Sequence, residues 1–268
     1  MNDSARKVRH LSPEEMSGSA IQVRNLTKTF QAKAGEVKAL DNVSFEVSQG
    51  EFLSILGPSG CGKSTLLRLI SGLIPFEGGE VRVQKTSNAS AQHIGFIFQF
   101  PNLLPWRNVL ENLMLTVEIH KLNKKDYYPR ARELLELTGL TEFEKSYGNE
   151  LSGGMQQRAS LAAALMLNPS ILLMDEPFGA LDALTRDRLN LDLLELWGKS
   201  RQTVIFITHS IPEAIFLSDR ILVLSHRPGR ILDNITIELP RPRTTKATKA
   251  DSRFGSHVAR ISELMGLE

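Results

Sequence analysis

The stretch EFLSILGPSGCGKSTLLRLISG at residues 51–72 constrains the fold more than any other part of the chain. An apolar run at 52–56 predicts a short buried strand, and a glycine-rich turn at 57–62 follows it. From Lys63 on, apolar residues recur at helical spacing, which predicts a helix. Such a turn points backbone N–H groups and the positive end of a helix dipole at one place, so it suits a polyphosphate. A loop that needs only flexible glycines would not require the strand before it and the helix after it.

Two side chains at the start of the predicted helix suit phosphate and metal. Lys63 can reach the terminal phosphates of a bound polyphosphate, and the Ser64 hydroxyl can ligate Mg²⁺. We therefore expect a phosphate-binding loop that works together with a divalent cation.

The bulk composition is that of a soluble globular protein, with 41% hydrophobic and 23% charged residues among 268. The formal net charge of +2 argues against nucleic acid as the main partner, which would want a strongly basic surface. Cys61 is the only cysteine, so no intramolecular disulfide is possible, which suits a reducing compartment. The N-terminal stretch has no apolar core and is not a secretory signal, and no run approaches the ~18 apolar residues of a membrane helix. Any membrane role must therefore pass through a partner.

The order of the predicted elements is that of an α/β chain with a helical insertion and no internal repeat. Residues 1–19 are polar and serine-rich, and we expect them to be disordered. Strand patterns follow at 21–26, 37–47, 80–84, 93–98, 171–174, 203–207, 221–224 and 231–237, with a loop at 31–36. Helical periodicity dominates 108–167 and returns at 184–197, 211–217 and 251–266, the last after a basic linker at 240–249.

Polar residues follow three of the predicted buried strands. These are Gln99, the pair Asp175-Glu176, and His209. Ligands of open parallel sheets bind at the carboxyl ends of the strands, so we expect these side chains to converge on the bound phosphates. Asp175 would hold Mg²⁺ and Glu176 would orient or deprotonate water, unless the pair is only a solvated strand end. His209, which alone would more often be structural, would donate to a γ-phosphate.

The octet LSGGMQQR at 151–158 predicts a second anion site. Ser152 can cap the following helix, while Gly153 and Gly154 let a ligand approach the helix N-terminus closely. Standing alone, the octet would be an ordinary capped helix. Phe30 has two interpretations: it packs in the core, the simpler one, or it stacks on a purine base.

Together these motifs resemble the ATP-binding subunits of ABC transporters. GPSGCGKST, Gln99, LSGGMQQR, ILLMDE, the Ala180-Leu181-Asp182 loop and His209 occur in the order and spacing of that family, over residues ~21–237. The resemblance implies a P-loop NTPase fold: a parallel-sheet core, an antiparallel β subdomain and an inserted α-helical subdomain. The ATPase domain would span 20–239, its helical subdomain about 101–167, and a tail with a helix 240–268.

The resemblance also implies a role for each motif residue, with ATP and Mg²⁺ as ligands. Phe30 would stack on adenine, although many members have Tyr there, and Asp182 would communicate across a dimer. Catalytic roles fall on Glu176 as the base and on Lys63, Gln99 and His209. Metal ligands would be Ser64, Gln99 and Asp175. Nucleotide contacts would come from Phe30, Gly57, Pro58, Ser59, Gly60, Cys61, Gly62, Lys63, Ser64, Thr65, Ser152, Gly153, Gly154 and Asp182. With Cys61 in the loop, we expect a bulky thiol reagent to block activity unless ATP is already bound.

The implied assembly is a homodimer in which Ser152, Gly153 and Gly154 meet the γ-phosphate of ATP bound to the other copy. Two integral-membrane permease subunits would dock near Gln99–Trp106, at the cytoplasmic face of the inner membrane, with a solute-binding protein acting indirectly. Alternatively, the apolar residues of PNLLPWRN pack within the helical insertion, and the two interpretations are compatible.

Three stretches, at 98–113, 175–186 and 209–231, resemble importers of the nitrate, sulfonate, taurine and bicarbonate type. The last stretch, with its Arg227-Pro228-Gly229-Arg230, resembles this branch most, and related importers of pyrimidine precursors carry similar stretches. Two other classes stay open. A soluble ABC ATPase that acts on ribosomes or DNA would usually have two cassettes or a coiled-coil insertion, and a nucleotide sensor without turnover would be expected to lose Glu176.

Overall fold

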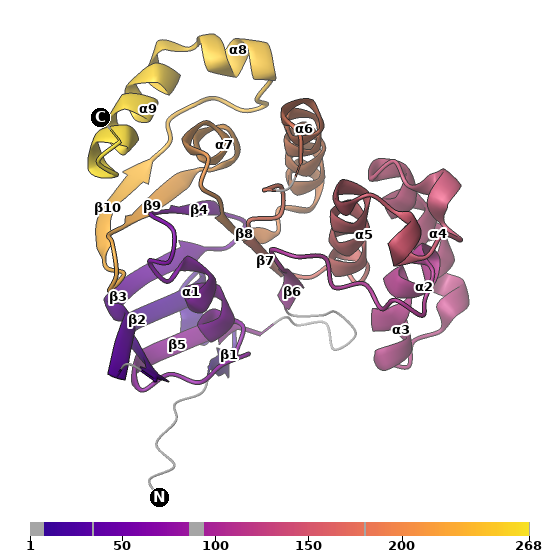
Figure 1. Cartoon of the computed structure of the whole chain (residues 1–268), viewed down its shortest axis with the longest axis horizontal. Coiled ribbons are helices and arrows are strands. Elements are labelled where there is room, and N and C mark those ends of the chain that lie inside the picture. Colours follow the sequence, from indigo (N-terminus) through magenta and orange to yellow (C-terminus); the bar gives the residue numbers. More distant parts are fainter. Residues whose placement is uncertain (1–7, 34, 86–93, 180, 268) are drawn as a thin grey trace, which may run out of the picture.

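The computed structural model describes residues 8–33, 35–85, 94–179 and 181–267. In Figure 1 the two β-sheets lie next to each other, and most of the helices lie above them and to their right. The chain forms a mixed six-stranded core sheet, a smaller β-sheet and an inserted helical subdomain.

The smaller sheet has four strands in the order β1-β5-β2-β3. Its strands are β1 (Arg9–Leu11), β2 (Ser19–Ala32), β3 (Gly35–Ser48) and β5 (Gly78–Gln84). β2 runs antiparallel to both β3 and β5, and β1 joins the edge parallel to β5. The loop predicted at 31–36 is wrong in extent, because β2 and β3 stay paired out to Ala32 and Gly35.

The prediction of disorder for residues 1–19 is wrong for its described part. β1 pairs with β5, and a 3₁₀ turn, η1 (Glu14–Met16), buries Met16 completely under the sheet. A parallel edge strand and one buried methionine order this polar segment, although its composition gives little hydrophobic signal. Residues 1–7 lie outside the described residues.

The larger sheet has six strands in the order β10-β9-β4-β8-β7-β6. Its strands are β4 (Phe52–Leu56), β6 (Ile94–Ile97), β7 (Ile171–Asp175), β8 (Thr203–Ile207), β9 (Arg220–Leu224) and β10 (Ile231–Thr236). All are parallel except β10, which is antiparallel to β9. β4, β7 and β8 are buried along their whole length, as their unbroken apolar runs predict for strands covered on both faces.

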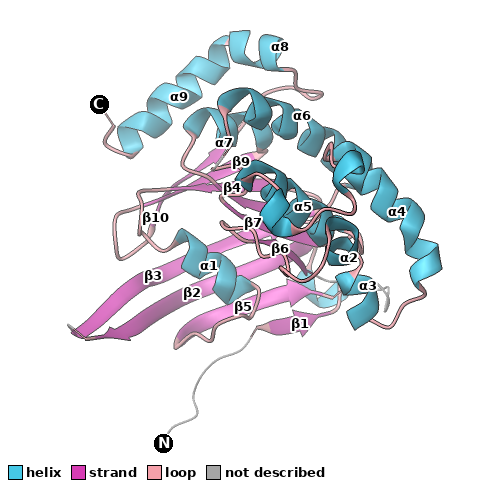
Figure 2. Ribbon diagram, turned by 45° about the vertical axis from the view of Figure 1, so that its right-hand side comes forward, coloured by secondary structure: helices cyan, strands magenta, loops and turns pink. Residues whose placement is uncertain are grey.

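Helix α1 (Lys63–Ile70) lies against the four-stranded sheet, as Figure 2 shows. Its apolar residues Leu66, Leu67, Leu69 and Ile70 share one core with the smaller sheet and with one face of the larger sheet. The helices α5, α6, α7 and α9 share a second core with the other face. The strand–turn–helix at 51–72 therefore sits where the two sheets meet, which holds the turn at 57–62 between them.

The predicted helical insertion is confirmed. It contains α2 (Val109–Leu113), α3 (Leu115–Ile119), α4 (Lys124–Leu137), η2 (Thr141–Phe143), η3 (Gly148–Glu150) and α5 (Gly153–Leu165). These helices gather beyond the β6 edge of the larger sheet (Figure 1). The remaining helices are α6 (Ala183–Ser200), α7 (Ile211–Leu217), α8 (Thr245–Ala250) and α9 (Ser252–Leu264). Among the described helices, none is both long and apolar enough to cross a membrane.

The segment predicted as a linker at 240–249 packs against the end of α7. Arg243 is only 6% exposed, and its Nη1 donates to the carbonyls of Ile215, Phe216 and Ser218 at 2.8–3.2 Å. The last carbonyls of a helix lack donors within the helix, so a buried guanidinium satisfies them and complements the helix dipole. Burial lowers the pKa of Arg243 to about 10, which leaves the side chain charged at neutral pH. One of the basic residues of this segment, Arg243, therefore caps the C-terminus of α7.

We expect Arg243→Ala to lower the free energy of unfolding by about 3 kcal/mol, because several buried carbonyls lose their donor at once. Urea denaturation measures this change. The matched control is Arg260→Ala, which removes an exposed ion pair with Asp233 and should cost at most about 0.5 kcal/mol. Equal losses in the two variants would contradict the capping role.

Candidate functional site

The phosphate loop presses against the backbone of β3. Gly62 has a φ of +108°, and a Cβ there would lie 2.8 Å from both the Ala39 carbonyl oxygen and the Leu40 side chain. Only glycine fits this position. Gly62 immediately precedes α1, so the first N–H groups of the helix face the space that the loop encloses. The loop is therefore a cradle shaped for backbone contact with a ligand.

Lys63 is 6% exposed and extends over this cradle. Its Nζ donates to the carbonyl oxygens of Gly57 at 2.7 Å and Pro58 at 3.0 Å. A buried ammonium that is held only by neutral carbonyls keeps its charge available to an anion. The residues present therefore fit a polyphosphate.

Ser64 and Asp175 meet at the floor of the site. The Ser64 Oγ donates to Asp175 Oδ1 at 2.8 Å, and Asp175 is 1% exposed. Burial raises the pKa of the Asp175 carboxyl, the Ser64 hydrogen bond lowers it, and the charge of Glu176 raises it further. A hydroxyl beside a desolvated carboxylate is an oxygen donor set that suits a divalent cation such as Mg²⁺.

Residues from three strand ends meet at the carboxylate of Glu176, and their predicted convergence on bound phosphates stays a prediction. The Oε2 of Glu176 accepts from Gln99 Nε2 at 3.2 Å, after β6, and lies 3.5 Å from His209 Nδ1, after β8. Glu176 itself has a φ of +47°, and its backbone N–H donates to the Ile207 carbonyl at 3.0 Å. This sparsely populated backbone conformation turns the side chain away from Asp175 and toward its two polar neighbours.

A cleft of about 480 Å³ runs from Phe30 on β2 past the phosphate loop to Glu176. Phe30 is 39% exposed, so the interpretation of it as a core residue is wrong. Its predicted stacking on adenine stays a prediction. The cleft is lined by Phe30, Ala32, Val37, Ala39, Ser59, Gly60, Gly62, Lys63, Ser64, Thr65, Gln99, Glu176 and Arg227.

The octet and the Asp182 loop lie elsewhere. Ser152 and Asp182 cap α5 and α6, accepting from the backbone N–H of Met155 at 3.3 Å and of Thr185 at 3.0 Å. The described residues that line the cleft include none of Ser152, Gly153, Gly154 and Asp182. Their predicted nucleotide contacts therefore stay a prediction. Ala180, named with the Asp182 loop, lies outside the described residues.

The family model of the ABC transporter matches residues 40–179, just over half of the chain. This chain belongs to the ABC transporter family. A Bacillus cereus aliphatic sulfonates import ATP-binding protein is 43% identical over 225 residues, which are 84% of this chain and 88% of the relative. A Rhizobium johnstonii taurine import ATP-binding protein is 44% identical over 223 residues, 82% and 85% of the two chains. A Synechocystis nitrate import ATP-binding protein is 38% identical over 253 residues, 91% and 94%.

A solved ABC transporter cassette, MJ0796, has the same fold as this ABC family member. It superimposes with a TM-score of 0.73 at 34% identity, covering 81% of this chain and 99% of the cassette. It was solved as a dimer, and a second structure of it shows a post-hydrolysis state bound to ADP and phosphate. The fold predicted from the sequence is therefore confirmed.

Two features of this ABC cassette are not predicted from the sequence. Arg227 lines the cleft, whereas the Arg-Pro-Gly-Arg run that contains it indicates only a resemblance to one group of importers. Glu213 on α7 is 7% exposed and accepts from Thr208 Oγ1 and, at 3.3 Å, from Asn190 Nδ2. Burial raises the pKa of Glu213. This buried network connects the loop that carries His209 to α6. In the sequence, the network is indicated only by a glutamate near the start of a short predicted helix.

The expectation for Cys61 is wrong. The thiol is 1% exposed within the core below the loop, and burial raises its pKa. Because the reactive form is an accessible thiolate, we expect a bulky maleimide to label Cys61 far more slowly in the native protein than in the urea-unfolded protein. Mass spectrometry of native and urea-unfolded protein measures both rates, and fast labelling that ATP suppresses would contradict the burial argument.

Proposed function

We propose that the chain is the ATP-binding and ATP-hydrolysing subunit that powers an ABC importer. The observation that carries the proposal is the convergence of Gln99, Glu176 and His209 beside the phosphate loop and the Ser64–Asp175 pair. A carboxylate held by two neighbouring side chains next to a phosphate cradle suits the activation of water for phosphoryl transfer. A sensor without turnover would not need this arrangement.

Each residue has a distinct task in this proposal. Lys63 and the loop N–H groups bind the phosphates, while Ser64 and Asp175, with Gln99, would hold Mg²⁺. A cation held there would neutralise the charge that develops on the phosphate oxygens. Glu176 accepts a proton from the attacking water, and Gln99 and His209 fix the direction of its Oε2.

The working unit is proposed to be a homodimer. Ser152, Gly153 and Gly154 lie at the N-terminus of α5 and are not among the described cleft residues, so one copy alone does not bring them to its own nucleotide. The unpartnered N–H groups of a helix start and its dipole attract anions, which suits the γ-phosphate on the other copy. ATP then stabilises the closed dimer, and hydrolysis releases it, because ligand affinity differs between the two states.

Two permease subunits are proposed to dock beside Gln99. Phe100 and Trp106 are 76% and 70% exposed, an unusual exposure for aromatic side chains that are not at an interface. Leu103 packs against the core, so the PNLLPWRN stretch serves both the insertion and an exterior surface. The proposal includes a location at the cytoplasmic face of the inner membrane, where the chain is held through its partners, and a solute-binding protein that delivers cargo to the permease.

The proposed cargo class is small anions of the nitrate, sulfonate, taurine and bicarbonate type. The support is the similarity to sulfonate, taurine and nitrate import proteins, each covered over more than four-fifths of its length. Cargo would not touch this chain, so importers of pyrimidine precursors remain the alternative within the same mechanism.

The test is phosphate release by the purified chain with Mg-ATP at decreasing protein concentration. We expect the specific activity to fall as the dimer dissociates, and we expect affinity purification from membranes to recover a polytopic membrane protein. Specific activity that stays constant down to concentrations where sedimentation detects only monomers would contradict the shared site. Recovery of ribosomes or DNA in place of a membrane protein would favour the non-transport alternative.

A further inference from the structure

The turn between β9 and β10, residues 225–230, is wedged between β3 and the phosphate loop. The Gly229 N–H donates to the Ala39 carbonyl at 2.9 Å, and the Asp41 N–H donates to the Gly229 carbonyl at 3.0 Å. A Cβ on Gly229 would lie 2.3 Å from the Cys61 carbonyl oxygen. The turn therefore touches the loop backbone directly, with no room for a side chain between them.

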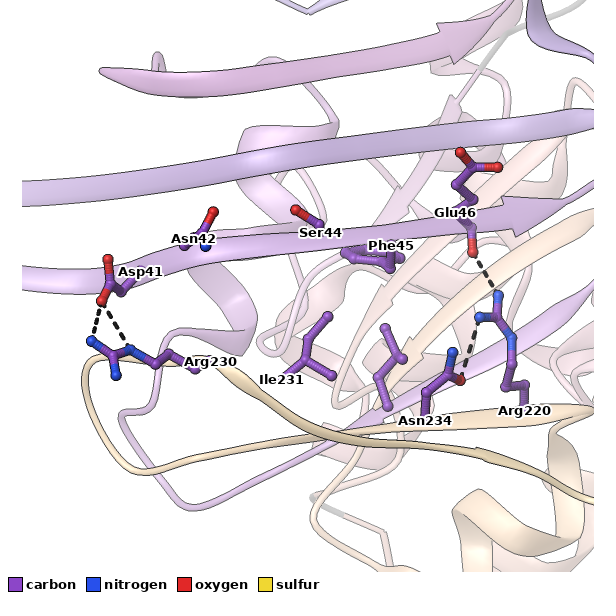
Figure 3. Close-up of a pocket in the computed structure, with 10 residues that line it drawn as sticks. Asp41, Asn42, Ser44, Phe45, Glu46, Arg220, Arg230, Ile231 and Asn234 are labelled. Carbon is purple, nitrogen blue, oxygen red and sulfur yellow. Dashed lines mark hydrogen bonds and ion pairs between the residues drawn. The ribbon is translucent and has the colours of Figure 1, made fainter.

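The two arginines of this turn have different partners. Arg230 reaches β3, where its Nε donates to Asp41 Oδ2 at 2.9 Å, as Figure 3 shows. Lys38 and Arg230 together lower the pKa of Asp41, so the Arg230 charge is compensated. Arg227 instead donates through Nε and Nη2 to one carbonyl, that of Gly60, at 3.0 and 2.9 Å. Within the described part of the chain, no carboxylate forms an ion pair with it.

Arg227 thus carries an uncompensated charge at the edge of the nucleotide cleft. It is exposed, and it lines the cleft together with Ser59, Gly60 and Lys63 of the phosphate loop. A guanidinium has five N–H donors, and the Gly60 carbonyl occupies only two of them. The remaining donors and the charge of Arg227 are therefore available for charge-assisted hydrogen bonds with an anionic partner.

We propose that Arg227 is an additional triphosphate-binding residue, which holds the Gly60 carbonyl with one edge of its guanidinium and offers the other edge to the phosphates. This inference rests on the proposed function, because it assumes that the cleft binds ATP. Arg227 and Lys63 then contact the phosphates from two sides of the loop. The planar guanidinium forms paired hydrogen bonds with phosphate oxygens, which a lysine ammonium does not.

The test compares Arg227→Gln with the matched control Arg230→Gln, in the same turn. Calorimetric titrations with ATP and with inorganic tripolyphosphate, each at two salt concentrations, give the affinities. We expect Arg227→Gln to weaken both ligands about tenfold, since it loses charge-assisted hydrogen bonds while its amide can still donate to Gly60. Its affinity should also depend less on salt. Arg230→Gln should stay within about twofold of the wild type.

A variant that conserves the charge of Arg227 distinguishes phosphate binding from structural support of the phosphate loop. Arg227→Lys should restore the salt dependence and part of the affinity, whereas a purely structural role would leave it as weak as Arg227→Gln. Wild-type affinity in Arg227→Gln, or equal losses in both glutamine variants, would overturn the inference and leave the proposed function intact. Failure of the wild-type chain to bind ATP would overturn both.

Discussion

Glu176→Gln is expected to bind ATP with an affinity within about twofold of the wild type and to lose at least about 100-fold in turnover. The amide has the shape of the carboxylate, so the contacts with Gln99 and His209 can persist in part. It cannot accept a proton from water. Since hydrolysis opens the proposed dimer, the variant should also accumulate as an ATP-bound dimer.

Phosphate release and size-exclusion chromatography with Mg-ATP check the two parts of this prediction. The matched control is Glu195→Gln, which removes an exposed carboxylate paired with Lys199 on α6 and should leave both readouts unchanged. Turnover that persists in Glu176→Gln would assign the base elsewhere. Turnover that stops without a dimer would separate the catalytic role of Glu176 from the proposed opening of the dimer.

The elements around Glu176 were predictable from the sequence because their signals are local. The runs ILLM and VIFI are apolar throughout, and each is followed directly by polar residues, Asp175-Glu176 and Thr208-His209. Parallel strands place such ends at one edge of the sheet, so spacing along the chain translates directly into proximity. The contacts of Gln99 and His209 with Glu176 follow from the register of β6, β7 and β8. The positive φ of Glu176 cannot be predicted from the apolar pattern.

The contacts that escaped prediction join segments far apart along the chain. Arg227 reaches Gly60 across 167 residues, and Arg243 caps α7 from a segment whose proline and basic content is typical of a linker. The composition of a segment indicates how it behaves in solvent. Tertiary contacts determine whether the segment is exposed or packed against the rest of the chain. The ordering of residues 8–19 has the same cause, because β5 supplies the pairing partner for β1.

Lys63→Ala is expected to weaken ATP binding about 100-fold, because it removes the buried ammonium of the phosphate cradle. The nucleotide-induced increase in stability reports this loss. At an ATP concentration 100 times the wild-type Kd, bound ATP stabilises the wild type by about 2.7 kcal/mol. A 100-fold weaker variant at the same concentration gains only about 0.4 kcal/mol. Thermal unfolding with and without Mg-ATP measures both values.

Thermal unfolding of Lys63→Ala without nucleotide shows whether a lost response to ATP reflects weaker binding or a destabilised fold. Lys63 also holds the Gly57 and Pro58 carbonyls, so the substitution removes two hydrogen bonds within the loop. It also removes a buried charge that forms no ion pair with a carboxylate of the described residues. These effects oppose one another, and the unliganded variant should unfold close to the wild-type temperature. Lys125→Ala, on the exposed face of α4, is the control that should keep the full response. If Lys63→Ala keeps a full response to ATP, Lys63 does not bind the phosphates as proposed, although it is the one lysine among the described residues that line the cleft.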